Sequence, residues 1–318
     1  MKPPVLIDVP LPSYIDELIT PLCEPHAWEE AFDEHSGPPL CERIEGLYVY
    51  AHPILDGPFL DRFPRLKVIS NFGVGMDHCD LDAVAERSIV AGNTPGAVDG
   101  ATADLAMAIL LAAARNVVVG DHFARSKEFT HFDPSLLLGK EVHGSTLGIF
   151  GMGRVGQAIA KRALGFDMKV LYHNRRQRPD DEATLGVEYV TRKELLSRSD
   201  FVCLSLPLSP ETHHYIGDSE FDLMGKDAIL VNVARGPVVD HDALYTALVE
   251  KKIRCAAIDV TEPEPLPRNH RLLSLENLVI TPHLGSAAYR SRRRMGEMTA
   301  ANLKAGLDGA ALPWPARP

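Results

Sequence analysis

Short runs of apolar residues alternate with amphipathic stretches along most of the chain. Near the N-terminus, the runs VLIDV, LYVYAH (47–52), LKVISNFG (66–73) and IVAGN (89–93) have the length and composition of buried strands. A helical stretch separates the second run from the third. Strands that alternate with helices predict a parallel sheet, so this part of the chain is expected to form an α/β domain.

The pattern changes after a turn at residues 94–96. Small and apolar residues from there to about residue 117 predict one long, well-buried helix. Its most apolar run, LAMAILLAAA, is too short to span a membrane and is flanked by Asp104 and Arg115. We therefore expect no membrane segment, and we place a domain boundary just before this helix.

A second series of strands follows. Residues 145–176 predict a strand, a glycine-rich turn, a helix and another strand. The runs DFVCLSLP, AILVNVARG, CAAIDV and LVITPHLG come next, with helical stretches between them. This order predicts a second doubly wound parallel sheet. The pattern becomes helical again from Pro282 to about Leu307.

Composition narrows the class of protein. A chain of 318 residues with 45% hydrophobic and 24% charged residues is typical of a globular enzyme with two domains. A formal net charge of −10 argues against general binding to nucleic acid or to an anionic membrane. The five cysteines form no CxxC pair, and the N-terminus lacks the apolar run of a signal peptide. We expect a cytoplasmic protein with reduced thiols and no metal site.

The segment Gly151–Gly156 is a G-x-G-x-x-G sequence between a predicted strand and a predicted helix. In that context the first glycine permits a tight turn, the second lets a pyrophosphate approach the backbone, and the third lets helix and strand pack closely. Free N–H groups at the start of the helix then bind the phosphates. We expect a dinucleotide here; a close-packed turn without a ligand is the alternative.

The next strand ends about 20 residues later, where an acid would bind the ribose hydroxyls of NAD. The chain has Asn174, Arg175 and Arg176 at this point. A neutral asparagine does not repel a 2′-phosphate, and an arginine can pair with one in a fork geometry. These residues favour NADP as the cofactor, with NAD still possible. The alternative is a solvated basic loop, which suits Arg178 best.

Arg235, Glu264 and His283 each follow a different predicted strand of the second sheet, and Asp259 ends the strand before Glu264. Ligands of open α/β sheets bind at the carboxyl ends of strands, so these side chains could converge near the nicotinamide. A histidine can donate a proton to a carbonyl, a carboxylate can orient it, and a guanidinium can polarise the carbonyl. Each also has a structural alternative: an ion pair at a helix start for Arg235, a surface acid for Glu264 and a strand-end polar group for His283.

Six ordered motifs carry a resemblance to a known family. They are SNFGVGMDHCDLDA, GNTPGAVDGATADLAMAILLAAAR, LGIFGMGRVGQAIAKRA, LPLSPETHHYI, ILVNVARGPVVDHDAL and AAIDVTEPEPLPRNHRLLSLENLVITPHLGSA. In these motifs the chain resembles the D-isomer-specific 2-hydroxyacid dehydrogenases over nearly its whole length. The stretches DVTEPEPLPRNHRLL and HNRR are most similar to the glyoxylate/hydroxypyruvate reductase branch, which often prefers NADPH.

The resemblance implies a flavodoxin-like substrate domain and a Rossmann cofactor domain, with the active site in the cleft between them. The substrate domain would comprise residues 1–98 and 288–318, and the cofactor domain residues 99–287. The implied catalytic residues are Arg235, Glu264 and His283, and the implied substrate contacts are Val74, Gly75, Arg235 and His283. The implied cofactor contacts are Thr102, Gly151, Gly153, Arg154, Val155, Gly156, Asn174, Arg175, Arg176, Pro207, Thr212, Val233, Ala234, Asp259 and Gly285.

The resemblance also implies a homodimer in which the segment after the long helix reaches the partner. That segment has Phe129 and Phe132 where relatives commonly place tryptophans. These phenylalanines could line the partner's active site, or they could simply pack in the dimer interface.

Together these features predict an NADPH-preferring reductase of small 2-oxo acids, of the glyoxylate/hydroxypyruvate type, that forms D-2-hydroxy acids with His283 as proton donor. An NAD-linked D-2-hydroxyacid dehydrogenase of another substrate is the first alternative. A nucleotide-sensing binding protein with the same fold is the second. It is disfavoured because the catalytic trio is complete and the chain has no flexible tails.

Overall fold

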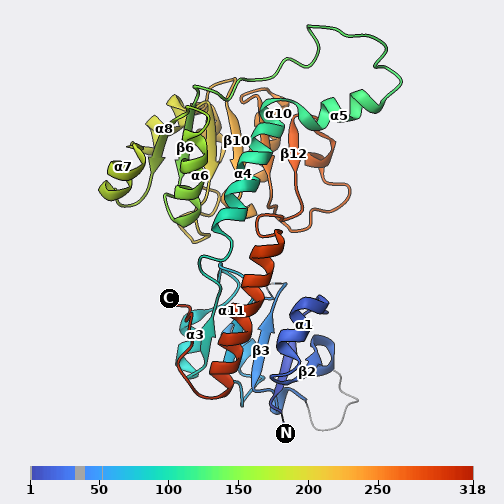
Figure 1. Cartoon of the computed structure of the whole chain (residues 1–318), viewed down its shortest axis with the longest axis vertical. Coiled ribbons are helices and arrows are strands. Elements are labelled where there is room, and N and C mark those ends of the chain that lie inside the picture. The colour runs from blue at the N-terminus through green and yellow to red at the C-terminus, as the bar shows by residue number, and fades with distance from the viewer. Residues whose placement is uncertain (1, 33–39, 52, 318) are drawn as a thin grey trace. The chain divides into compact units, whose positions relative to one another are not determined.

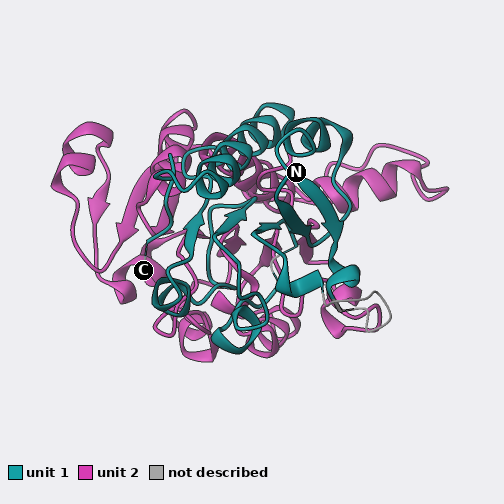
Figure 2. Cartoon of the chain, turned by 90° about the horizontal axis from the view of Figure 1, so that it is seen from below, with its two compact units in different colours: residues 1–98, 288–318 teal, residues 99–287 magenta. Residues whose placement is uncertain are grey.

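The computed structural model describes residues 2–32, 40–51 and 53–317. The chain divides into two compact units, which Figure 2 shows in different colours. Unit 1 comprises residues 1–98 and 288–318, and unit 2 comprises residues 99–287. Each unit is built on one parallel sheet, which confirms the predicted fold class.

Unit 1 contains a five-stranded parallel sheet with the order β2-β1-β3-β4-β5, which is the flavodoxin-like order. Its strands are β1 (Pro4–Ile7), β2 (Glu24–Ala27), β3 (Gly46–Val49), β4 (Val68–Asn71) and β5 (Val90–Gly92). Its α-helices are α1 (Ser13–Ile19), α2 (Gly57–Leu60), α3 (Leu81–Glu86) and α11 (Tyr289–Leu307).

The C-terminal helix α11 packs on the unit 1 sheet although it is far from these strands in sequence (Figure 1). The hydroxyls of Tyr48 and Thr299 lie 3.0 Å apart, and the hydroxyl of Ser70 donates to the carbonyl oxygen of Thr299 at 2.8 Å. A Cβ on Gly306 would lie 2.4 Å from the side chain of Val68, so glycine permits this close approach. Along the sequence, the chain therefore leaves unit 1, runs through unit 2 and returns to unit 1 with α11.

Unit 2 contains a seven-stranded parallel sheet with the order β12-β11-β10-β9-β6-β7-β8. Counted from β8, this is the Rossmann order 3-2-1-4-5-6 with one further strand. The strands are β6 (Thr146–Phe150), β7 (Lys169–His173), β8 (Glu188–Tyr189), β9 (Phe201–Leu204), β10 (Ile229–Asn232), β11 (Cys255–Ile258) and β12 (Leu278–Ile280).

Helices cover both faces of the unit 2 sheet. They are α4 (Asp99–Ala114), α6 (Arg154–Leu164), α7 (Pro179–Leu185), α8 (Arg192–Arg198), α9 (Asp218–Leu223) and α10 (His241–Val249). The helix α5 (Val117–Arg125) has no buried residue and projects away from the sheet (Figure 1). Ile149 packs in one core with α4 and α6, whereas the next residue, Phe150, packs in the other core with α8, α9 and α10. Because both faces are covered, the strands are apolar at successive positions.

The structure differs from the sequence prediction at four places. The edge strands β2 and β8 were not predicted, because they are short and their residues are mostly half-buried or exposed. The helical stretch between the second and third predicted strands is the single turn α2. Asn116 has a positive φ of 53°, and α5 is bent by 60° relative to α4.

Neither α4 nor any other single helix among the described residues is long and apolar enough to cross a membrane. The bent pair α4 and α5 passes the same test by length and composition. Half-buried and buried residues of α4 pack in the core of unit 2, where this helix contacts α6, β10 and β11.

Candidate active site

The glycine-rich turn joins β6 to α6, which begins at Arg154. Gly151 has a positive φ of 96°, and a Cβ there would lie 2.6 Å from the carbonyl oxygen of Ser205. A Cβ on Gly156 would lie 2.1 Å from the carbonyl oxygen of Gly151, so this approach excludes a side chain. Gly153 is exposed, and no atom lies within 4 Å of its Cβ position. The open space beside Gly153 fits a pyrophosphate at the start of a helix.

A groove of about 1000 Å³ opens beside this turn. It is lined by residues of the turn 151–153, of the segment 173–181 after β7 and of the segment 205–215 after β9. The strand order reverses at β6, and open α/β sheets bind nucleotides at such a point. The groove includes Pro207 and Thr212, and the hydroxyl of Thr212 donates to the carbonyl oxygen of Pro207 at 2.7 Å.

Asn174 follows β7 and contacts the glycine turn. Its Oδ1 accepts a hydrogen bond from the backbone N–H of Met152 at 2.8 Å, and its carbonyl oxygen accepts one from the hydroxyl of Tyr189 at 3.2 Å. This is the position where an acid would bind the ribose hydroxyls of NAD. The asparagine therefore helps to build the turn, a role that its place in the sequence did not indicate.

Three arginines line the groove, but their partners differ. Arg178 forms an ion pair with Asp181, whose carboxylate also accepts a hydrogen bond from Gln157 at 3.1 Å. Arg175 and Arg176 are exposed, and neither forms a hydrogen bond or an ion pair within the described part of the chain. Their guanidinium groups can therefore bind a phosphate, whereas that of Arg178 is already paired with a carboxylate.

Glu211, in the segment after β9, also lines the groove. The hydrogen bond from the hydroxyl of Ser209 holds the pKa of Glu211 below its ordinary value, and the positive charge of Arg175 contributes to a smaller extent. Arg175 thus lies close enough to Glu211 for its charge to lower the pKa of this acid, although the two form no ion pair in the described structure.

Thr102, Asp259 and Gly285 come together at the start of α4 and after β11 and β12. The hydroxyl of Thr102 donates to the carbonyl oxygen of Gly285 at 3.1 Å. The Asp259 side chain is buried and accepts one hydrogen bond from the hydroxyl of Thr281 at 2.6 Å and two from backbone N–H groups of residues 284 and 285 at 2.7 and 2.8 Å. Asp259 therefore fixes the segment that carries His283. This positioning role of Asp259 was not indicated by the sequence.

His283 and Glu264 form a close pair. Nδ1 of His283 lies 2.5 Å from Oε1 of Glu264, and the two side chains are 36% and 39% exposed. His283 has a positive φ of 55°, and its backbone N–H donates to the carbonyl oxygen of Asp259 at 2.8 Å. A carboxylate at Nδ1 orients the imidazole ring and favours its protonated form.

Glu264 is anionic at neutral pH. Burial alone would raise the pKa of this carboxyl group. The hydrogen bond and charge of His283, the backbone N–H of Thr261 and the charge of Arg235 together outweigh burial and hold the pKa below its ordinary value. The histidine thus faces a carboxylate rather than a carboxylic acid.

Arg235 follows β10 and is half-buried. Its Nη1 donates to the carbonyl oxygen of Ala234 at 2.9 Å, and its own carbonyl oxygen accepts from the side chain of Asn232 at 2.9 Å. Its charge lowers the pKa of Glu264. Val233 and Ala234 are buried.

The three predicted catalytic residues follow β10, β11 and β12, which are neighbours in the sheet. The glycine turn follows β6, and in it Val155 is half-buried beside the exposed Arg154. Most of the residues predicted in unit 2 therefore lie at two places on the carboxyl edge of one sheet, one after β6 and β7 and the other after β10–β12.

In unit 1, Val74 and Gly75 lie in the turn after β4. The carbonyl oxygen of Val74 accepts from the side chain of Asn93 at 2.7 Å, and that of Gly75 accepts from the side chain of Asn71 at 2.9 Å. Among the residues with a described structure, the backbone N–H groups of Val74 and Gly75 donate no hydrogen bond. Such N–H groups suit an anion.

The chain is similar to one family of known proteins along most of its length. Residues 107–285 match the model of the D-isomer specific 2-hydroxyacid dehydrogenase, NAD binding domain. The glyoxylate reductase of Thermococcus litoralis is 41% identical in a match that covers 98% of this chain and 96% of the relative.

Two solved structures share both units. The NADPH-dependent glyoxylate/hydroxypyruvate reductase from Sinorhizobium meliloti, in complex with NADP and malonate, has a TM-score of 0.88 and is 31% identical, covering 99% of this chain and 97% of its own. The D-lactate dehydrogenase from Aquifex aeolicus, complexed with NAD and lactic acid, has a TM-score of 0.85 and is 29% identical, covering 96% of each chain.

Proposed function

The chain belongs to the D-isomer-specific 2-hydroxyacid dehydrogenase family, and we propose that it is an NADPH-preferring reductase of glyoxylate, hydroxypyruvate and similar 2-oxo acids. As a member of this family it is an NAD(P)-dependent oxidoreductase of small 2-oxo acids. The observation that carries the finer proposal is the pair Arg175 and Arg176, exposed in the groove beside the neutral Asn174.

The reaction requires a hydride at the carbonyl carbon of the substrate and a proton at the carbonyl oxygen, and the nicotinamide cofactor supplies the hydride. We assign the proton to Nε2 of His283, because Nδ1 is occupied by Glu264. The anionic Glu264 orients the ring and stabilises its cationic form. We assign Arg235 to the substrate, where its guanidinium polarises the carbonyl and binds the carboxylate.

The N–H groups of Val74 and Gly75 are the second set of groups that we assign to the substrate carboxylate. Their carbonyl oxygens are held by asparagine side chains, which fix the shape of the turn, and neither N–H group donates a hydrogen bond within the described part of the chain. A carboxylate with two oxygens can accept from both N–H groups.

The preference for NADPH is supported by the charges after β7. Asn174 has no charge that would repel a 2′-phosphate, and its side chain is already bound to Met152. A guanidinium can give a phosphate two parallel hydrogen bonds, and Arg175 and Arg176 offer two such groups. The relative from Sinorhizobium meliloti is NADPH-dependent and was solved with NADP, which supports the same preference.

Steady-state reduction of a series of 2-oxo acids tests this function. Glyoxylate, hydroxypyruvate, pyruvate and bulkier acids would each be reduced with NADPH and with NADH. We expect glyoxylate and hydroxypyruvate with NADPH to give the highest kcat/KM. Turnover with NADH but not with NADPH would show that the cofactor is NAD rather than NADP. Nucleotide binding without turnover of any acid would favour a sensor.

We also propose a homodimer that forms through the segment beginning with α5. This helix and the residues after it extend away from the unit 2 sheet (Figure 1). The exposed apolar side chains of this segment are Val117, Val118, Phe129, Phe132, Leu136, Leu137 and Leu138. Apolar side chains gathered on one exposed segment are typical of a protein interface. Light scattering should give the mass of a dimer, and Phe129→Ser/Phe132→Ser should shift it toward the monomer.

A further inference from the structure

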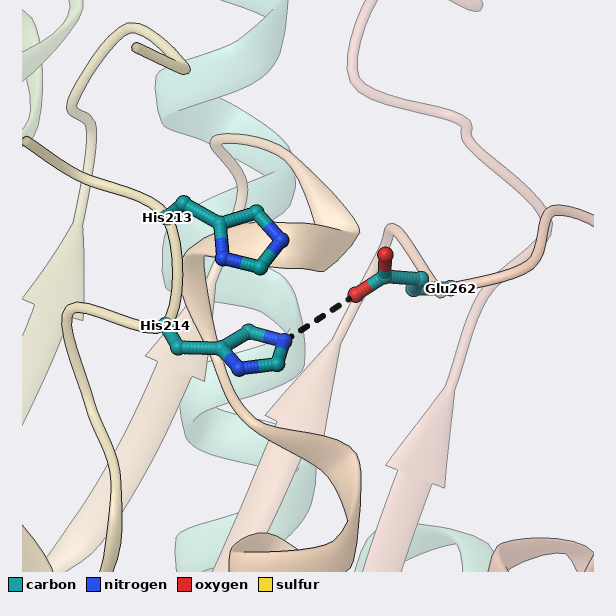
Figure 3. Close-up of side chains that lie close together, drawn as sticks. All are labelled: His213, His214 and Glu262. Carbon is teal, nitrogen blue, oxygen red and sulfur yellow. Dashed lines mark ion pairs between the residues drawn. The ribbon is translucent and has the colours of Figure 1, made fainter. Parts of the chain in front are cut away.

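Two histidines and a glutamate form a cluster on unit 2, apart from the catalytic trio. His213 and His214 belong to the segment after β9, and Glu262 belongs to the loop after β11. Figure 3 shows the two rings one above the other, with the Glu262 carboxylate pointing toward their nitrogens. The ring centroids are 4.0 Å apart, and Nε2 of His214 lies 3.5 Å from Oε2 of Glu262.

The spacing of these groups matches a metal site. In the described parts of the chain, they form the one group of three His, Cys, Asp or Glu side chains whose ligand atoms all lie within 4.8 Å of one another. Zinc binds nitrogen and oxygen at about 2.0–2.1 Å, so a tetrahedral site separates its ligand atoms by about 3.3 Å. The distance between His214 and Glu262 already agrees with this value. His213 is exposed, so its ring can turn toward the same point.

The surroundings orient His214 as a ligand. Its Nδ1 faces Oδ2 of Asp240 at 3.8 Å, while its Nε2 faces Glu262. Metal-binding histidines commonly direct their second nitrogen to a carboxylate. Asp240 is held in place because its Oδ1 accepts from the backbone N–H of Asp242 at 2.9 Å. The backbone N–H of His214 donates to the carbonyl oxygen of Pro237 at 2.7 Å, which fixes the loop.

We propose that His213, His214 and Glu262 bind one divalent transition-metal ion, with Zn²⁺ as the best match. Two imidazoles and one carboxylate are an established zinc ligand set that leaves a fourth position for water, whereas Mg²⁺ and Ca²⁺ prefer oxygen ligands alone. The ion would join the segment that lines the nucleotide groove to the loop that carries Glu264. This site is independent of the proposed reduction.

Other side chains compete weakly for the ion. Burial raises the pKa of four thiols to about 11 or 12, so at neutral pH they are protonated, whereas a metal requires the thiolate. These thiols are Cys23, Cys79, Cys203 and Cys255. His283 and Glu264 offer one imidazole and one carboxylate and therefore need a direct control.

Titration of the metal-free full chain with Zn²⁺, in competition with a chromophoric chelator, tests the proposal. We expect one equivalent per chain. His213→Gln/His214→Gln should lose this binding. Asp240→Asn, which can still cap α10, should weaken it about 10–100-fold. The matched control His122→Gln/His131→Gln removes two exposed histidines elsewhere and should bind as the wild type does.

Circular dichroism would establish that each variant is folded, and Glu262→Gln provides the test if the double histidine variant is not. Unchanged Zn²⁺ affinity in the folded variant would overturn the site, as would the lack of saturable binding to the wild type. Loss of binding in His283→Ala would place the ion at the active site and equally overturn it. A thiolate-to-cobalt absorption band with Co²⁺ would assign the ion to a cysteine instead.

Discussion

The two ends of the unit 2 sheet differ in how firmly their functional side chains are held. At the β10–β12 end, Asp259 is 2% exposed and accepts three hydrogen bonds, and Glu264 contacts His283 at 2.5 Å. At the β6–β7 end, the backbone is fixed, but Arg175 and Arg176 are exposed and have no ion pair among the described residues.

This difference suits the two tasks that we propose for these ends. Proton transfer requires a donor with a defined position and tautomer, which a network of hydrogen bonds provides. Selection of a cofactor by its 2′-phosphate requires positive charge within reach, and long exposed side chains can adjust to the phosphate. Substitutions at the first end should therefore lower the rate or the stability. Substitutions at the second end should change the choice of cofactor.

The largest effect is expected at His283, the proposed proton donor. His283→Ala should fold and bind cofactor but reduce 2-oxo acids about 10²–10⁴-fold more slowly, because the carbonyl oxygen loses its general acid. Single-turnover kinetics and a melting curve would measure the two properties separately. Near wild-type turnover in the folded variant would remove His283 from the mechanism.

Asp259→Asn tests whether the catalytic end depends on a fixed segment. The amide would place a donor where the carboxylate accepts three hydrogen bonds, so we expect a loss of about 1–3 kcal/mol in the free energy of unfolding. Urea unfolding would measure this loss. Arg175→Ala/Arg176→Ala is the matched control at the other end and should unfold as the wild type does. Equal losses of unfolding free energy in both variants would contradict the claim that the two ends are held with different firmness.

Glu264→Gln should have the smallest effect on the free energy of unfolding, and the pH dependence of that effect tests its cause. The pKa of Glu264 is lower in the folded chain than the ordinary 4.5, so its carboxylate stabilises the fold above that pH and stops doing so as pH falls through the lower value. Because the side chain is 39% exposed, we expect a loss of about 0.2–1 kcal/mol at neutral pH. The difference from the wild type should shrink in acid. A difference that grows in acid would contradict the lowered pKa.

Much of the fold could be predicted because its signals are local. The apolar runs, the glycine turn and the helix after residue 96 each depend on neighbouring residues. The edge strand β2 was missed because its sequence, EPHA, contains a proline and has little apolar character. The bend after α4 was missed because Asn116 interrupts a run that remains apolar on both sides.

The residues predicted for the site were those that carry recognisable chemistry. Arg235, Glu264 and His283 could be proposed because Arg235 and His283 are reactive types at predicted strand ends and Glu264 is an acid in the loop just beyond another. The positioning role of Asp259 and the contact of Asn174 with the turn depend on side-chain directions, which the sequence does not define. The approach of Glu262 to residues 213–214 likewise arises only from the packing of two loops.

The most direct test of the account is the ratio of kcat/KM with NADPH to kcat/KM with NADH, measured with glyoxylate. We predict a ratio above one for the wild type, and a fall of about ten- to hundred-fold in Arg175→Ala/Arg176→Ala, since a charge-assisted hydrogen bond contributes about 1.5–3 kcal/mol. Arg178→Ala is the control, because that guanidinium is paired with Asp181, and it should leave the ratio nearly unchanged. A wild-type ratio below one, or equal losses with both cofactors in the double variant, would contradict the assignment of these arginines to the 2′-phosphate.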